Sequence, residues 1–139
     1  MNNSLAISIP TYNRLKFFEK NIIELIQLVR PLKIPIYISD DSDNDSIRKV
    51  VNKLASDYKL IFYLRNNPSL KHDQNYLNAL HMPSADYVWL IGDSVKLNKN
   101  AIGMVLNVIE KYQPNIISVN AENRRINFSK KTYDDPRTV

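Results

Sequence analysis

Cysteine is absent from this 139-residue chain, and glycine is scarce, since Gly92 and Gly103 are its two glycines. Without cysteine the chain has no disulfide bonds and no thiolate metal sites. Two isolated glycines do not make a glycine-rich phosphate loop, which weighs against P-loop and dinucleotide-binding proteins. The histidines His72 and His81 are too few for a histidine-based metal centre.

Long apolar runs are also missing, because no stretch approaches the ~20 residues that span a bilayer. The N-terminal sequence MNNSLAISIP lacks the basic and apolar segments of a signal peptide. We therefore expect a cytoplasmic protein. Apolar residues make up 44% and charged residues 24% of the chain, which is typical of a globular domain. The net charge of +5 favours anionic partners, although scattered lysines on a solvated surface explain it equally well.

Apolar segments of two kinds alternate along the chain. Short continuous runs predict buried strands, and runs with apolar residues three or four positions apart predict helices. Alternating strands and helices predict an α/β fold, with a parallel sheet covered by helices on both faces. Residues 87–91 are apolar on both sides, so we place this strand centrally. The predicted strands are 5–9, 34–39, 59–64, 87–91 and 115–119, and the predicted helices are 16–29, 47–58, 74–81 and 101–112.

Polar segments follow four of the predicted strands. Because the carboxyl ends of parallel strands share one edge of a sheet, ligands bind there. Asp40, Asp41 and Asp93 lie in these segments, where carboxylates hold a cation or accept hydrogen bonds from a sugar or base. Each acid alone is equally well explained by a turn. Together they favour a site, since neighbouring acids repel unless a ligand joins them.

One motif competes with this interpretation. Residues 41–45, DSDND, have the alternating acids of a calcium-binding EF-hand loop. The sixth position is Ser46 in place of glycine, however, and the twelfth is Asn52 in place of glutamate, so we reject it. His81 suits a helix end, whereas His72 lies in a predicted loop and is a weak ligand candidate.

The ordered segments LAISIPTYNR, IPIYISDDSDNDS and NYLNAL…ADYVWLIGDS resemble the N-terminal half of family 2 glycosyltransferases, which have the Rossmann-like GT-A fold. The resemblance covers roughly residues 4–119. It implies that 1–119 form a nucleotide-sugar-binding half-domain. The polar segment 120–139 would then be a tail or the start of a missing acceptor half. Members of the family are usually longer, so we expect a truncated chain.

The resemblance also implies a set of site residues. Tyr12 would pack against the base of the nucleotide, and Asp41 would accept a hydrogen bond from it, with Asp40 supporting the turn. Arg14 would contact phosphate, unless it is an ordinary surface cation. The residues implied to contact the nucleotide-sugar are Pro10, Thr11, Tyr12, Arg14, Asp40, Asp41, Asp73, Asn75 and Asp93.

The metal motif departs from the family pattern. In that pattern a strand ends in several acids, whereas here Asp93 is followed by Ser94 and Val95. Mg²⁺ or Mn²⁺ bound through a diphosphate needs only one or two protein carboxylates. The resemblance thus implies a metal held by Asp93, with Ser94 as a weak extra oxygen. It does not identify a general base, because the late acids, Glu122, Asp134 and Asp135, lie in no recognisable context.

We therefore predict a glycosyltransferase, or its donor-binding part, that builds a bacterial surface polysaccharide. It would transfer sugar from a nucleotide-diphosphate donor to a glycan or lipid-linked acceptor, with inversion. Nucleic acid is not an expected partner, whereas peripheral binding at the inner face of the membrane and homodimerisation stay open. One alternative is a non-catalytic nucleotide-sugar-binding module, and the other is a phospho-acceptor signalling domain.

Overall fold

A computed structural model describes residues 4–119 as a four-stranded sheet with helices packed on it. All strand pairs are parallel, in the order β3-β2-β1-β4, so the predicted α/β fold is confirmed. The elements are β1 Leu5–Thr11, α1 Leu15–Val29, β2 Ile36–Asp40, α2 Ser46–Asp57, β3 Ile61–Arg65, α3 Lys71–His81, β4 Tyr87–Leu90 and α4 Ala101–Tyr112, with a short 3-10 helix at Arg30–Leu32.

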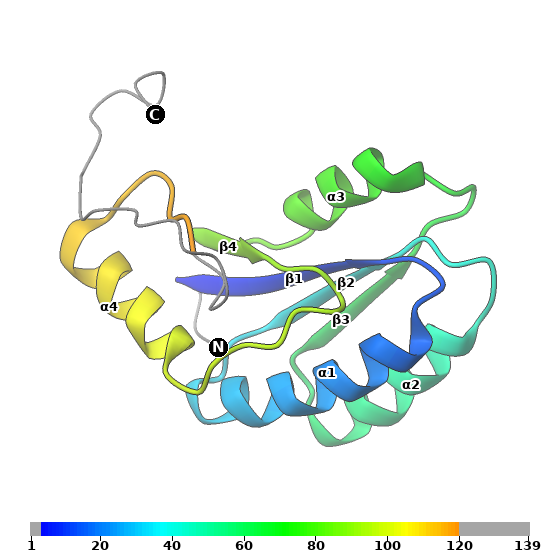
Figure 1. The fold of residues 1–139 in the computed structure, drawn as a ribbon, viewed down its shortest axis with the longest axis horizontal. Helices are drawn as coiled ribbons and strands as arrows, with labels where there is room; N and C mark the ends of the chain where they lie inside the picture. Colours follow the sequence, from blue (N-terminus) through cyan, green and yellow to red (C-terminus); the bar gives the residue numbers. More distant parts are fainter. Residues whose placement is uncertain (1–3, 120–139) are drawn as a thin grey trace.

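The helices cover both faces of the sheet. Figure 1 shows α1 and α2 together on one face and α3 on the other. The strand β1 runs through the centre, and every residue in it is buried. Its apolar side chains, Leu5, Ile7 and Ile9, belong to one core cluster that also contains residues of α1, α2 and α4.

Helix α1 shows how the sequence pattern produces this packing. Its buried residues are Phe18, Ile22, Leu25, Ile26 and Val29, which recur at spacings of three and four and so form one stripe. The stripe packs into the core, whereas Glu19, Lys20, Ile23 and Gln27 on the other side of the helix are exposed. The helix ends at Val29 because Pro31 follows in the short 3-10 turn. No helix among residues 4–119 is long and apolar enough to cross a membrane.

Two strand predictions are wrong. Strand β4 is an edge strand of the described sheet and not a central one, and its residues are only half-buried. Residues 115–119 do not form the predicted fifth strand, and Ile116 is 78% exposed. A strand needs a partner with which to share backbone hydrogen bonds, and β4 pairs with β1 alone in the described part of the chain. An apolar run predicts the ability to form a strand but not the presence of that partner.

Helix α3 begins at Lys71, three residues before the predicted start at position 74. The backbone N–H groups of Leu70 and Lys71 donate to the Asp41 carboxylate, at 2.7 and 3.1 Å. This distant acid satisfies the first donors of the helix, which a local sequence pattern does not reveal. The predicted segment 120–139 and its proposed boundary lie outside the described residues.

The buried stripe on α1 gives a test of the fold. Ile22 is 2% exposed and its neighbour Ile23 is 44% exposed. Ile22→Ala should lower the free energy of unfolding by about 3 kcal/mol, because it removes buried methylene groups and leaves a cavity. Ile23→Ala, the matched control on the solvent side, should change it by less than about 1 kcal/mol. Urea unfolding followed by circular dichroism measures both, and equal effects would contradict the assigned packing.

Candidate functional site

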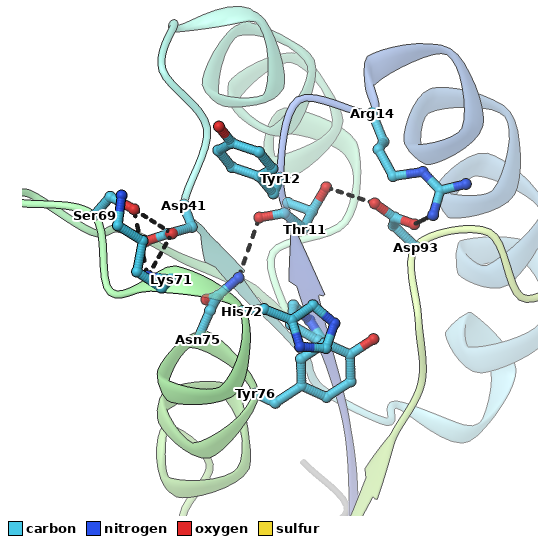
Figure 2. A pocket seen from close by; sticks show the side chains of 11 residues that line it. Thr11, Tyr12, Arg14, Asp41, Ser69, Lys71, His72, Asn75, Tyr76 and Asp93 are labelled. Carbon is cyan, nitrogen blue, oxygen red and sulfur yellow. Dashed lines mark hydrogen bonds and ion pairs between the residues drawn. The ribbon is translucent and has the colours of Figure 1, made fainter.

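A hollow of about 320 Å³ lies at the carboxyl edge of the sheet, where Figure 2 shows it from close by. The end of β1 and residues that follow β1, β2 and β4 supply part of its wall, and α3 with the loop before it supplies the rest. The lining residues are Pro10, Thr11, Tyr12, Arg14, Asp41, Ser69, Lys71, His72, Asn75, Tyr76 and Asp93.

Thr11, the last residue of β1, bonds to three walls of the hollow. Its carbonyl oxygen accepts hydrogen bonds from the backbone N–H of Asp41 at 3.0 Å and from Nδ2 of Asn75 at 3.2 Å. Its hydroxyl donates to Oδ2 of Asp93 at 3.0 Å. The ends of β1 and β2, helix α3 and the turn after β4 are therefore held in one fixed arrangement.

Asp41 faces the loop before α3. Its carboxylate accepts hydrogen bonds from the Ser69 hydroxyl at 2.7 Å and from the backbone N–H groups of Leu70 and Lys71. Burial pushes the pKa of Asp41 upward, but these bonds and one from Asn66 outweigh it, so the pKa lies below its ordinary value. Asp41 thus stays ionised and supplies a fixed negative charge beside the hollow.

Asp93 lies opposite, next to Arg14, as Figure 2 shows. Its Oδ1 is 3.6 Å from Nη1 of Arg14, and its backbone oxygen accepts a hydrogen bond from Asn21 at 3.0 Å. Burial raises the pKa of Asp93, although the Thr11 hydroxyl, the Arg14 charge and the Ser94 N–H act in the opposite direction. The Arg14 side chain is 49% exposed and its guanidinium lies 4.9 Å above the Phe17 ring.

Tyr12 stands at the rim of the hollow, and its side chain is half exposed. Its hydroxyl donates to Oδ2 of Asp43 at 3.2 Å, and the Asn13 amide donates to the same oxygen. Asp43 in turn donates its backbone N–H to Oδ1 of Asn13 at 3.0 Å. These bonds tie the loop after β1 to the loop after β2, so the Tyr12 ring is presented at the rim in a defined position.

A neutral hydrogen-bond network lies beneath the hollow. Oδ1 of Asn75 accepts hydrogen bonds from the Ser39 hydroxyl at 2.6 Å and from Asn66 at 3.0 Å. Asn78 donates to Ser39 at 2.8 Å and to Asn66 at 3.1 Å. Asn75 therefore fastens α3 to the strand ends. The sequence implied a ligand contact for this residue and did not indicate this structural role.

Most of the residues implied by the sequence line this one hollow, but three do not. Asp40 is fully buried below it, where Oδ2 accepts a hydrogen bond from Tyr63 at 2.7 Å and Oδ1 accepts one from the Ser42 N–H at 3.0 Å. The side chain of Asp73 is exposed on α3 and pairs with His72. Ser94 is exposed and does not line the hollow.

Sequence reasoning also missed three lining residues, Ser69, Lys71 and Tyr76. Ser69 and Lys71 lie in the segment whose helix start was predicted too late. Tyr76 follows His72 by four positions, so the two share a helix face, and their ring centroids are 4.7 Å apart. This spacing of four in the sequence could have indicated that the His72 and Tyr76 rings lie together on one side of the site.

The remaining acids of the loop after β2 bind protein groups. Asp43 is held by Tyr12 and Asn13, whereas Asp45 pairs with Arg65 at 2.6 Å and Arg48 at 2.7 Å. These acids point to separate partners and do not converge on one centre. The acids of this loop thus hold neighbouring segments of the protein in place.

The described residues do not fit a metal centre held by the protein. Asp93 is the one acid on its side of the hollow, and both of its carboxylate oxygens already face protein partners, Thr11 and Arg14. No group of three histidine or acidic residues in the described range is placed to hold a metal ion. The predicted second ligand, Ser94, faces solvent.

Comparison with known proteins identifies the family. The profile of Glycosyl transferase family 2 matches residues 6–137, which is nearly the whole chain. The chain belongs to glycosyl transferase family 2. The resemblance found in the sequence is thereby confirmed, and the phospho-acceptor alternative is set aside. Members of this family commonly depend on a divalent metal, which makes the donor set around Asp93 a departure from the common pattern.

Two curated relatives are bacterial transferases. The abequosyltransferase RfbV of Salmonella typhimurium is 27% identical over 108 residues, which cover 76% of this chain and 32% of the relative. The GalNAc(5)-diNAcBac-PP-undecaprenol beta-1,3-glucosyltransferase of Campylobacter jejuni is 29% identical over 103 residues, which cover 73% of this chain and 33% of the relative. The matched part of this family 2 chain thus spans about a third of each relative.

A solved structure shows the same fold. The S. aureus protein TarS, residues 1–349, superposes with a TM-score of 0.66 at 15% sequence identity. The superposition covers 79% of this chain and 33% of TarS. At this identity the likeness concerns the fold, and it confirms the α/β architecture predicted for the family 2 chain.

The lowered pKa of Asp41 predicts how stability depends on pH. A carboxyl with a lower pKa in the native chain than in the unfolded chain stabilises the fold above its unfolded-state pKa, and this contribution is lost as pH falls through the native pKa. Asp41→Asn should therefore lower the free energy of unfolding by about 1–3 kcal/mol at pH 7. The difference from wild type should shrink as the pH falls below about 4.

Urea unfolding at a series of pH values between neutral and strongly acidic measures this difference. Asp86→Asn is the control, because Asp86 is exposed. It should change the free energy of unfolding by less than about 0.5 kcal/mol. A constant difference between wild type and Asp41→Asn at every pH would contradict the assigned role of the charge.

Proposed function

We propose that the hollow binds a nucleotide-diphosphate sugar and that this chain is the donor-binding part of a glycosyltransferase. One observation carries the proposal. Tyr12, Asp41 and Asp93 come from three different strand ends and line the same hollow, in a chain of glycosyl transferase family 2. The carboxyl edge of a parallel sheet is also where α/β folds bind nucleotides.

The lining suggests how the donor lies. Tyr12 offers a flat, half-exposed ring on which a base can stack, and Asp41 lies beside it as a hydrogen-bond acceptor. Arg14, on the opposite side of the hollow in Figure 2, offers the guanidinium that suits a phosphate. We therefore orient the base toward Tyr12 and Asp41, and the diphosphate toward Arg14.

Transfer then follows from this orientation. The oxygen of an acceptor hydroxyl forms a bond to the anomeric carbon while the bond from that carbon to the diphosphate oxygen breaks. The diphosphate leaves with the electron pair, and a general base takes the hydroxyl proton. Attack from the face opposite the diphosphate inverts the configuration. The late acids Glu122, Asp134 and Asp135 lie outside the described residues, and we assign the base to none of them.

The acceptor is proposed from the relatives. The name of the Campylobacter jejuni relative contains an undecaprenol-linked glycan, and the Salmonella typhimurium relative is an abequosyltransferase. By analogy we propose a glycan or lipid-linked acceptor in the synthesis of a bacterial surface polysaccharide. A lipid-linked acceptor would bring the protein to the cytoplasmic face of the membrane.

A second candidate is donor binding without transfer. It is favoured by the sequence Gly92–Asp93–Ser94–Val95, which has one acid where the family pattern has several. Both candidates predict nucleotide binding, so the distinguishing measurement is turnover. Release of free sugar or of glycan product from a panel of nucleotide-sugars would establish transfer or hydrolysis by this chain.

Nucleotide binding is tested at Tyr12. Isothermal titration with UDP, GDP, dTDP, CDP and ADP should reveal binding of at least one of them to the wild type. Tyr12→Ala should weaken that binding by about tenfold, because a stacked base contributes about 1–3 kcal/mol. Tyr12→Phe keeps the ring and should retain most of the affinity.

Tyr112→Ala is the matched control, because Tyr112 is exposed on α4 and does not line the hollow. It should leave the affinity unchanged. If none of the diphosphates bound to the wild type, with or without Mn²⁺, the proposed function would be wrong.

A further inference from the structure

The side chain next to Asp93 is a cation supplied by the protein itself. Nη1 of Arg14 lies 3.6 Å from Oδ1 of Asp93, on the side of the hollow to which we assign the diphosphate. The resemblance to the family puts a divalent metal at this acid. Arg14 and such a metal would compete for the same carboxylate oxygen, so the structure raises the question of which cation serves the donor.

The donor set at Asp93 favours arginine. Mg²⁺ requires nearly ideal octahedral geometry and at least one carboxylate oxygen directed at it. Here Oδ2 is bound to the Thr11 hydroxyl at 3.0 Å, and Oδ1 faces the Arg14 guanidinium. The neighbouring Ser94 is exposed, and position 95 is a valine, so the turn offers no second acid.

Arg14 is well suited to bind a phosphate in addition to Asp93. A guanidinium carries five N–H donors in a planar fork, and the contact with Asp93 engages one nitrogen at a distance longer than a hydrogen bond. The ring of Phe17 lies with its centroid 4.9 Å from the guanidinium carbon, a cation–π contact that leaves the N–H groups free to bind a ligand. Arg14 also precedes the first turn of α1, where the helix dipole adds positive potential. No acidic residue in that turn offsets it.

We propose that Arg14 binds the diphosphate of the donor directly, in place of a divalent metal held by the protein. Asp93 is then a positioning residue, which aims the guanidinium into the hollow and is itself held by Thr11. This inference rests on the proposed function, because it concerns how that donor is bound. It differs from the common metal dependence of the family in predicting that donor binding needs no metal.

The first measurement is the metal dependence of binding. The wild-type chain is titrated with the five nucleoside diphosphates, first in EDTA and then with excess Mg²⁺ or Mn²⁺. For the diphosphate that binds, the dissociation constants under the two conditions should agree within about threefold, because the phosphate charge is met by Arg14.

The second measurement uses variants. Arg14→Gln should weaken diphosphate binding by about tenfold or more in EDTA, and Arg14→Lys should fall between, because lysine keeps the charge but loses the fork. Binding of the corresponding nucleoside, which has no phosphate, should not change. Lys16→Gln is the matched control, because it also removes one positive charge, two positions from Arg14. The Lys16 side chain is exposed and does not line the hollow.

Asp93→Asn separates the two possible roles of the acid. The substitution removes the negative charge that faces Arg14 but leaves the guanidinium itself, so it should weaken diphosphate binding in EDTA by less than Arg14→Gln does. If Asp93 held a metal, the same substitution would abolish the part of the affinity that depends on Mn²⁺. Circular dichroism and thermal unfolding confirm that each variant is folded.

The outcomes are distinguishable. Binding that requires Mg²⁺ or Mn²⁺ and is lost in Asp93→Asn would overturn the inference while supporting the proposed function. Binding in EDTA that Arg14→Gln leaves unchanged would likewise overturn it, since another group would meet the phosphate. Failure of every diphosphate to bind under both conditions would overturn the proposed function and this inference with it.

Discussion

The hydrogen bonds of Thr11 hold the candidate site together. Its carbonyl oxygen bonds to Asp41 and Asn75, and its hydroxyl bonds to Asp93, so one residue joins the ends of β1 and β2 to α3 and to the turn after β4. The residue is 2% exposed and ends the most buried strand of the sheet. The walls of the hollow are thus anchored to the buried end of β1, in addition to the bonds between their loops. This arrangement gives the preorganisation that binding of a polar ligand needs.

The two acids of the hollow have separate partners within the protein. On one side Asp41 is stabilised by hydrogen bonds from the start of α3, and on the other Asp93 is balanced by Arg14. Each acid therefore has its own partner before any ligand arrives, which relieves the repulsion that neighbouring carboxylates would suffer. The expectation that clustered acids need an exogenous cation overlooked these partners, because they come from positions 14 and 69–71, which the pattern of acids does not include.

Local patterns predicted the elements whose structure depends on local properties. The apolar stripe of α1 and the buried run of β1 gave the bounds of these elements within two residues, because both patterns depend only on the spacing of nearby apolar residues. The start of α3 depends on Asp41, thirty positions earlier, and the fifth strand depends on a partner, so neither could be predicted locally. In the site, Asp41 and Asp93 could be predicted from their places after the strands, and Tyr12 from the family resemblance, whereas Tyr76 required the helix to be placed first.

The neutral network beneath the hollow is sensitive to deamidation, because it depends on which atoms of Asn75 donate and which accept hydrogen bonds. In that network the Asn75 amide nitrogen donates to the Thr11 carbonyl at 3.2 Å, while its oxygen receives two donors. Deamidation to aspartate would preserve the outline of the side chain but replace the donor with an oxygen, so that two acceptors would face each other inside the protein. A loss of ammonia at this single position would thus loosen α3 from the strand ends.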